Sequence, residues 1–329
     1  MIIPPPVVVD ADVLIRNVEY AVRHGRLGAL PRYASTGFAT TSGALIFASV
    51  ETGDEVFRHL GDVADRRQVD LSVAHGVWHE RIAPSIRFVS VSEDLIDDPR
   101  IGGTDEKDRH TARLACLLAP AVLATDNRKH YKPFGLDDTK TDVVAKDLAT
   151  LGDFALGAKG AAAVPLVTGS LVIDGSNKVI EKLGRGDALL IAALLLGGLI
   201  LILRTERGRV MRARLGYVAA EVAPKLVELT DTAYAAGDRV HAVAIDRVAE
   251  PNATMSLARW LAIDERVMTT AEIAEWLATR SYRFKKGRNH RTETRAWLLR
   301  TPCFEEVARG RWTLGHPLVL LPELEEKPS

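Results

Sequence analysis

Two aspartates follow apolar runs that the sequence predicts to be buried strands. Asp10 comes directly after residues 7–9, three valines, and Asp126 comes directly after residues 121–125. Short apolar runs alternate with helical patterns over residues 1–145, so we expect an α/β domain with a parallel sheet covered by helices. Open α/β sheets place their sites at the carboxyl ends of the strands. The two carboxylates are therefore candidates for chemistry.

Two further acids can reach the same edge of this sheet. Asp108 opens the helical stretch that precedes the second strand, and Glu55 lies in a helix that follows a predicted strand at 45–48. Gathered carboxylates repel each other and are costly to desolvate unless a cation is present. Hard oxygen ligands suit Mg²⁺ or Mn²⁺, and a water on such an ion can attack a phosphodiester. The alternative, that each acid is a turn, cap or surface residue, stays open.

These stretches resemble the motifs of one nuclease family. VVVDADVLIR resembles the opening motif of PIN-domain nucleases, an apolar strand that ends in Asp-x-Asn/Ser. ASVETGDEVFRHL resembles their second motif, and DEKDRHTARLA and AVLATDNRKHYKPFG resemble the third and fourth. The order and spacing fit, with 18 positions from Asp108 to Asp126. The resemblance covers about residues 6–145, which is under half of the chain.

The resemblance implies a Rossmann-like sheet, Mg²⁺ or Mn²⁺ at the acidic site and hydrolysis of RNA. The catalytic residues, which hold the metal or orient its water, would be Asp10, Glu55, Asp108 and Asp126. Asp105 can share the third role, and Asp12 adds a negative charge where the family more often has Asn or Ser. Many members are toxins of toxin–antitoxin pairs, but this chain is much longer than the usual toxin, so that role does not follow.

Basic residues surround the fourth motif. Arg128, Lys129 and Lys132 lie just after Asp126, together with His130 and Tyr131. Cationic side chains beside an acidic site can contact the phosphates of a nucleic acid. We therefore predict Arg128, Lys129 and Lys132 as nucleic-acid contacts, with a solvated loop as the alternative.

A long apolar run interrupts the soluble pattern. Residues 188–203 are sixteen positions without a charged or polar side chain, followed at once by Arg204 and Arg207. As a helix this run spans about 24 Å, slightly less than the roughly 30 Å of a bilayer core. With the weaker apolar segment before it, the run favours a helical hairpin in a membrane. A helix buried in the protein core is the alternative.

The last part of the chain predicts a small basic domain. Two amphipathic helices at 269–280 and 289–300, with Thr270 as the N-cap of the first, precede a hairpin at 304–315. This order loosely resembles a winged helix, whose second helix enters a nucleic-acid groove. We predict Arg288, Arg291 and Arg295 as contacts of that helix. A protein-interaction module is the alternative.

Composition sets the remaining limits. Apolar residues make up 47% and charged residues 26%, which is typical of a folded chain. Acids and bases balance at 43 each, so net charge favours no partner. Cys116 and Cys303 lie far apart and predict reduced thiols in a cytosolic setting. The opening residues lack the pattern of a secretory signal, so we expect none.

The expected organisation has four parts. Residues 1–150 form the nuclease-like domain, 151–208 the apolar hairpin, 209–254 a helical linker and 255–320 the winged-helix-like domain. The predicted strands are 7–9, 45–48, 87–91, 121–125 and 141–144.

The predicted function is that of a metal-dependent endoribonuclease. It would act at the cytoplasmic face of the cell membrane, or in the cytoplasm if residues 188–203 are a core helix. The alternatives are an inactive nucleic-acid-binding or regulatory scaffold and a DNA-directed nuclease. DNA or a protein as the partner of the C-terminal domain, and a homodimer, also stay open.

Overall fold

A five-stranded sheet forms the centre of the N-terminal half in the computed structural model. The structure describes residues 5–26, 46–136, 146–148, 150–151, 228, 230–247, 251–264, 267–280, 282–285 and 289–316. The strand order is β3-β2-β1-β4-β5, and all neighbours are parallel except β4 and β5. The strands are β1 (Val7–Val9), β2 (Ile46–Ser49), β3 (Ile86–Val89), β4 (Ala121–Ala124) and β5 (Ala244–Ile245). The α/β class with a mainly parallel sheet is thereby confirmed.

Four of the predicted strands appear close to their expected positions. The strand predicted at 141–144 lies outside the described residues. The sheet instead gains β5 from the segment that we expected to be a helical linker, in which residues 230–242 are helical. β5 has two residues, and such a short strand leaves no period in the sequence.

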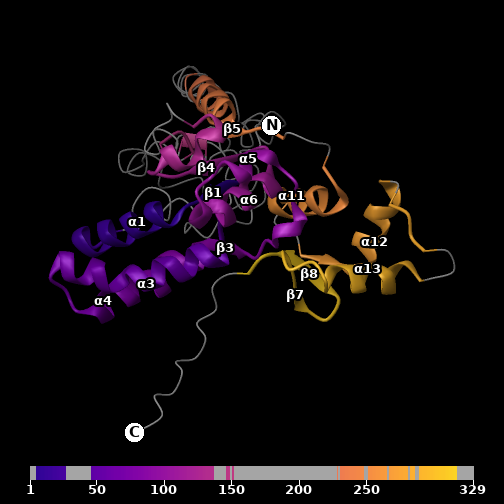
Figure 1. Ribbon diagram of the computed structural model, residues 1–329, viewed down its shortest axis with the longest axis horizontal. Coiled ribbons are helices and arrows are strands. Elements are labelled where there is room, and N and C mark those ends of the chain that lie inside the picture. The colour runs from indigo at the N-terminus through magenta and orange to yellow at the C-terminus, as the bar shows by residue number, and fades with distance from the viewer. Residues whose placement is uncertain are drawn as a thin grey trace, which may run out of the picture.

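Helices cover both faces of this sheet (Figure 1). Val7 and Val9 point to the layer of α1 (Ala11–His24) and α3 (Val50–Arg67), and Val8 points to the layer of α6 (Arg109–Leu118). Successive side chains of a strand face opposite ways, so a strand in the middle of three layers must be apolar throughout. This explains why β1 consists of valines.

Polar residues at the ends of two strands begin the next helices. Asp10 caps α1 by accepting a hydrogen bond from Ala11 N, and Ser49 caps α3 by accepting one from Thr52 N. Such caps satisfy backbone N–H groups that the first helical turn leaves unpaired. Both helices therefore start at the carboxyl edge of the sheet.

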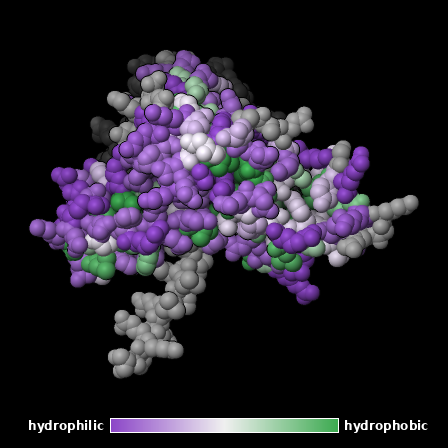
Figure 2. All heavy atoms as spheres, in the orientation of Figure 1, coloured by the Kyte–Doolittle hydropathy of each residue, from purple (hydrophilic) through white to green (hydrophobic). Residues whose placement is uncertain are grey.

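Short helical segments connect the larger elements. They are α4 (Leu71–Gly76), the π-helical η1 (Val77–Ile82), η2 (Ala83–Ser85), η3 (Glu93–Leu95), α5 (Pro99–Gly102), η4 (Glu106–Asp108) and η5 (Arg128–Phe134). Figure 2 shows a mostly hydrophilic face with small separate hydrophobic patches, one of them over α4 at the left. Exposed Leu71 and Val73 belong to that helix.

The C-terminal part holds a second, three-stranded sheet. Its elements are α11 (Ala253–Asp264), β6 (Met268–Thr269), α12 (Thr270–Thr279), α13 (His290–Leu298), β7 (Phe304–Ala308) and β8 (Arg311–Leu314). The antiparallel order is β6-β8-β7. The two helices and the hairpin predicted here are confirmed.

The N-cap predicted for the first of these helices is wrong by one residue. Thr269 caps α12 in a capping box with Glu272. The Thr270 hydroxyl instead accepts from Trp312 Nε1 at 2.9 Å and donates to Gly310 O at 3.3 Å. Thr270 therefore binds the hairpin and does not cap the helix.

The two halves of the molecule are joined by polar contacts at the end of α6. Arg259 donates to Leu118 O and Pro120 O, and Arg247 donates to Ala119 O. These carbonyls lie at the end of α6, where side-chain donors satisfy backbone groups that the helix leaves unpaired. The helix is thus completed by residues far along the chain.

A second contact joins the two sheets. Phe88 of β3 and His316 exchange two backbone hydrogen bonds, of 2.8 and 3.0 Å. Between His316 and β8 lies Gly315, whose φ is +59° and at which an added Cβ would collide with Phe88 O. Only glycine fits so close an approach of two backbones. The C-terminal unit is therefore docked against the edge of the first sheet.

Among the described helices none is long and apolar enough to cross a bilayer. The predicted hairpin at 151–208, including the apolar run at 188–203, lies outside the described residues except for its first position.

Candidate active site

Asp10 lies at the centre of the carboxyl edge of the sheet. Its side chain is buried, with a residue exposure of 4%. One oxygen, Oδ1, accepts from Ala11 N at 2.9 Å, and the other, Oδ2, accepts from Thr125 Oγ1 and Tyr131 OH, each at 3.0 Å. Burial and then the charge of Asp108 raise the pKa of Asp10, against the lowering effect of these hydrogen bonds. The donors to this carboxylate within the described part of the chain are therefore all neutral groups.

Tyr131 connects Asp10 to a chain of buried hydroxyls. Burial and then the negative charges of Asp10 and Asp108 raise the pKa of Tyr131 well above its usual value, so the phenol stays protonated and donates. Its hydroxyl also interacts with Thr111, whose Oγ1 lies 3.1 Å from Thr52 Oγ1. These contacts tie the start of α6 and the start of α3 to Asp10.

Asp12 and Asp126 form a second pair of carboxylates beside the first. Asp12 Oδ2 accepts from Asp126 N at 3.0 Å, and Asp126 Oδ2 pairs with Arg16 Nη1 at 2.9 Å. Burial, and then the charges of Asp10 and Asp126, raise the pKa of Asp12 to about 7. Asp12 is therefore coupled to two of the predicted catalytic residues, although the sequence motifs alone do not assign it that role.

Asp108 lies at the end of η4, beside the loop that follows β4. Its Oδ2 is 2.7 Å from Nδ1 of His130, and Nδ2 of Asn127 lies 2.9 Å from the same His130 nitrogen. The short helix η5 turns His130 toward Asp108 and Tyr131 toward Asp10. Side chains of the fourth sequence motif therefore contact Asp108 and Asp10.

Glu55 is not brought to the aspartates by any contact among the described residues. It is half-buried in α3, one turn after Thr52. Positions three residues apart share a face of a helix, so Glu55 lies on the side from which Thr52 contacts α6. Asp10 and Asp108 are thus coupled by charge, and Asp126 is linked to Asp10 through Asp12. No contact among the described residues joins Glu55 to this group.

The donor set fits a divalent cation in type. Carboxylate oxygens are the ligands of Mg²⁺ and Mn²⁺, and here burial and then neighbouring carboxylate charges raise the pKa of Asp10 and of Asp12. Within the part of the chain that the structure describes, no three His, Cys, Asp or Glu side chains are arranged closely enough to hold a metal ion. The carboxylate oxygens instead face hydroxyls, backbone N–H groups and Arg16.

The basic residues predicted around the site lie at the surface of η5. Lys129 and Lys132 are exposed, and Arg128 is half-buried. All three belong to the segment that carries His130 and Tyr131 to the aspartates. They are therefore close in the chain to the two side chains that contact the aspartates.

Of the three C-terminal arginines predicted to contact nucleic acid, one is exposed, one is ion-paired and one is not described. Arg291 is exposed on α13, whereas Arg295 is paired with Glu306 at 2.9 Å. Arg288 lies outside the described residues.

Sequence reasoning missed Tyr131, Thr125 and Arg16 as partners of the acids. Thr125 and Arg16 had a weak signal, because each lies within one of the four motifs. Tyr131 lies in the fourth motif as well, but nothing local points to Asp10 as its partner, since that contact spans 121 positions of the chain.

Comparisons with known proteins give no assignment. Neither models of protein families, nor curated proteins, nor solved structures match this chain. The interpretation of the site therefore depends on its geometry and chemistry.

Proposed function

We propose that the N-terminal half is a metal-dependent endoribonuclease of the PIN type. One observation carries the proposal: the central strand β1 is followed by Asp10 and Asp12, whose pKa values are raised by burial and by neighbouring carboxylates. Carboxylates kept in such an unfavourable arrangement are typical of functional sites. The strand–helix alternation and the motifs around Asp108 and Asp126 support the same assignment.

Each group of residues has its own role in this proposal. Asp10, Glu55, Asp108 and Asp126 would hold Mg²⁺ or Mn²⁺ or orient its water. Such an ion, when bound, lowers the pKa of a bound water and offsets charge on the phosphate. Tyr131 and Thr125 hold Asp10 in place by donating to Oδ2. The basic side chains of η5 that would position the RNA backbone are Arg128, Lys129 and Lys132.

The C-terminal unit would act as a nucleic-acid-binding accessory of the winged-helix type. Its chain order of helix, strand, two helices and a hairpin supports this, as does the small antiparallel sheet β6-β8-β7. The unit also carries exposed basic side chains, namely Arg283, Lys285 and Arg291. Placement at the membrane through residues 151–208 belongs to the proposal and is independent of the site.

A second candidate is an inactive nucleic-acid-binding scaffold. It is favoured by the finding that, in the described ranges, no three acidic, histidine or cysteine side chains are grouped to hold a metal. A DNA-directed nuclease is a third candidate, because both nucleic acids present the same phosphodiester to an acidic site.

The test is cleavage by the full-length chain with Mn²⁺, using labelled RNA and DNA of one sequence. We expect RNA to be cut, and Asp10→Asn and Asp126→Asn to lower the rate by about a hundredfold or more. Asp65→Asn, an exposed acid of α3, is the matched control and should leave the rate unchanged. Parent-like rates in the first two variants would show that the assigned site is wrong.

The other outcomes separate the alternatives. Cleavage of DNA alone would support the DNA-directed nuclease. Binding of RNA without cleavage of the RNA or of the DNA would support the scaffold.

A further inference from the structure

A series of aromatic rings leads from the core of the C-terminal unit to its surface. Ring centroids lie 5.7 Å apart for Phe304–Trp297, 6.1 Å for Trp297–Tyr282, 5.0 Å for Tyr282–Phe284 and 4.1 Å for Phe284–His290. Phe304 is buried, whereas His290 at the start of α13 is exposed. The series therefore ends in a ring that is open to solvent.

The last two rings are stacked face to face. The planes of Phe284 and His290 differ by 13°. Because His290 is exposed while Phe284 lies behind it half-buried, the outer face of the imidazole can continue the stack with another flat ring. A nucleic-acid base offers such a ring, and stacking on it is independent of sequence.

Cationic side chains flank this stacked pair. Arg283 and Lys285 alternate with Tyr282 and Phe284 along the loop, and Arg291 follows His290. All three cations are exposed, and none has an ion-pair partner among the described residues. Alternating rings and cations are the composition of surfaces that bind a strand by its bases and its phosphates together.

The nearby acids make hydrogen bonds within the unit. Both carboxylate oxygens of Glu293 accept from Lys285 N, at 3.0 and 3.3 Å. Glu306 accepts from Arg295 and from Gly310 N. Glu293 therefore holds the loop in shape, and a loop ordered in advance loses less entropy when it binds.

The exposed face of α13 fits a duplex groove less well. Arg295 is engaged by Glu306, and Leu299, just after the helix, is 59% exposed. A duplex keeps its bases stacked inside, where the rings of a protein surface cannot reach them, whereas a single strand can splay them out.

We propose that the loop at 282–285 and the start of α13 form a platform for single-stranded RNA. One base stacks on His290, and the flanking cations Arg283, Lys285 and Arg291 contact its phosphates. That the bound strand is also the substrate rests on the proposed nuclease function. The binding of single-stranded RNA to the platform does not depend on it.

Binding can be measured without cleavage. The full-length chain is titrated in EDTA against a fluorescein-labelled 15-nucleotide single-stranded RNA and against the same strand annealed to its complement, with fluorescence anisotropy as the readout. We expect the single strand to bind at least about tenfold more tightly than the duplex, because only the strand offers stacking.

Matched variants test the two kinds of interaction. His290→Ala should weaken single-strand binding by about tenfold, since the stacking ring is removed, while His290→Tyr should restore it. Tyr234→Ala, an exposed aromatic on the helix at 230–242, is its control. Arg283→Gln with Lys285→Gln should lower the slope of log affinity against log salt by about 0.7 for each phosphate that is no longer neutralised, whereas Arg58→Gln should not.

Parent-like binding by His290→Ala, or equal affinity for strand and duplex, would overturn the platform. So would the absence of binding to either RNA, which would favour a protein partner for this unit. Strand binding by a chain that cuts no RNA would support the platform and reject the nuclease.

Discussion

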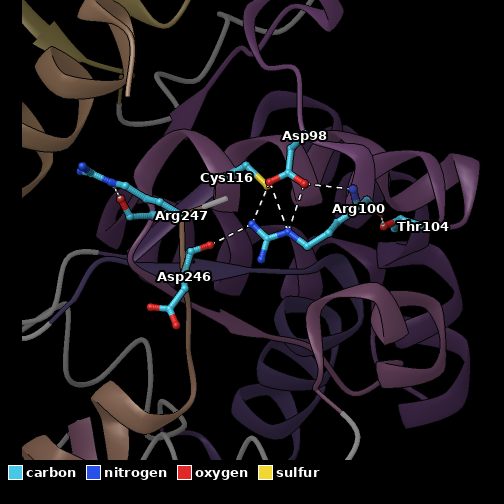
Figure 3. A network of polar contacts seen from close by, with 7 residues as sticks. Asp98, Arg100, Thr104, Cys116, Asp246 and Arg247 are labelled. Carbon is cyan, nitrogen blue, oxygen red and sulfur yellow. Dashed lines mark hydrogen bonds and ion pairs between the residues drawn. The ribbon is translucent and has the colours of Figure 1, made fainter. Parts of the chain in front are cut away.

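Two aspartates with buried side chains, Asp98 and Asp10, show opposite ways of placing a carboxylate inside this protein. Arg100 donates to Asp98 from Nε and, at 2.7 Å, from Nη2 (Figure 3). Burial would raise the pKa of Asp98, but these bonds and the cation outweigh burial, and the pKa is lowered. Asp10 receives neutral donors from the described residues around it and lies near Asp108, so its pKa is raised.

The difference separates a carboxylate that is compensated by a cation from one that receives neutral donors among the described residues. Arg100 also donates to the carbonyl of Asp246, and Cys116 donates to Asp98, so this network holds α5, α6 and the segment after β5 together. Burial and the adjacent Asp98 raise the pKa of Cys116 to about 12, which makes its thiol unreactive. The carboxylates of Asp10 and Asp12 instead keep raised pKa values, because burial and neighbouring carboxylates disfavour their charged forms.

The largest expected effect on stability comes from breaking the ion pair between Asp98 and Arg100. Asp98→Asn should lower the free energy of unfolding by about 2 kcal/mol, because it leaves Arg100 partly buried without its anion. Asp10→Asn should cost less, since it removes an unfavourable charge. Urea unfolding of both variants measures the difference, and Asp65→Asn is the control. Equal losses would contradict the distinction between the two carboxylates.

Asp12→Asn should change the pH dependence of stability in the metal-free protein. The folded pKa of Asp12, about 7, lies above its ordinary value of 3.8, so between these values the folded state keeps a proton that the unfolded state has released. Parent stability should therefore fall as pH rises through this window, and the variant should lack that slope.

The variant should then be more stable than the parent at pH 8, by about 1 kcal/mol or more, and the difference should shrink toward pH 4. Urea unfolding at several pH values in EDTA measures it. A difference that stays constant with pH would show that Asp12 does not carry a raised pKa.

The smallest effect is expected at the residue that supports Asp10. Tyr131→Phe removes the hydrogen bond to Asp10 together with the contact to Thr111, and it should cost about 1 kcal/mol of stability. Because this bond lowers the pKa of Asp10, its removal should move the acidic limb of the pH–rate profile to higher pH while KM for RNA stays unchanged. Thermal unfolding and RNA cleavage measure the two effects, with Tyr234→Phe as control. A rise in KM that accounts for the whole decrease in kcat/KM would contradict a positioning role.

A second difference lies between strands that the sequence predicts and contacts that it does not. β1 to β4 are mainly apolar runs, with Arg87 in β3 and Ser49 at the end of β2, and that local pattern marks them. β5 is two residues long, and its pairing with β4 joins Ala121 to Ile245. No local pattern encodes so distant a partner.

The sequence alone determined that aspartates stand at the ends of buried strands and that helices begin beside them, because burial and capping act over a few neighbouring residues. Only the tertiary structure decided that Asp12 is coupled to Asp126 and that Tyr131 donates to Asp10. These outcomes depend on how α1, α3, α6 and η5 pack around one edge of the sheet. Charge coupling and desolvation act through space, and they therefore appear only once the chain has folded.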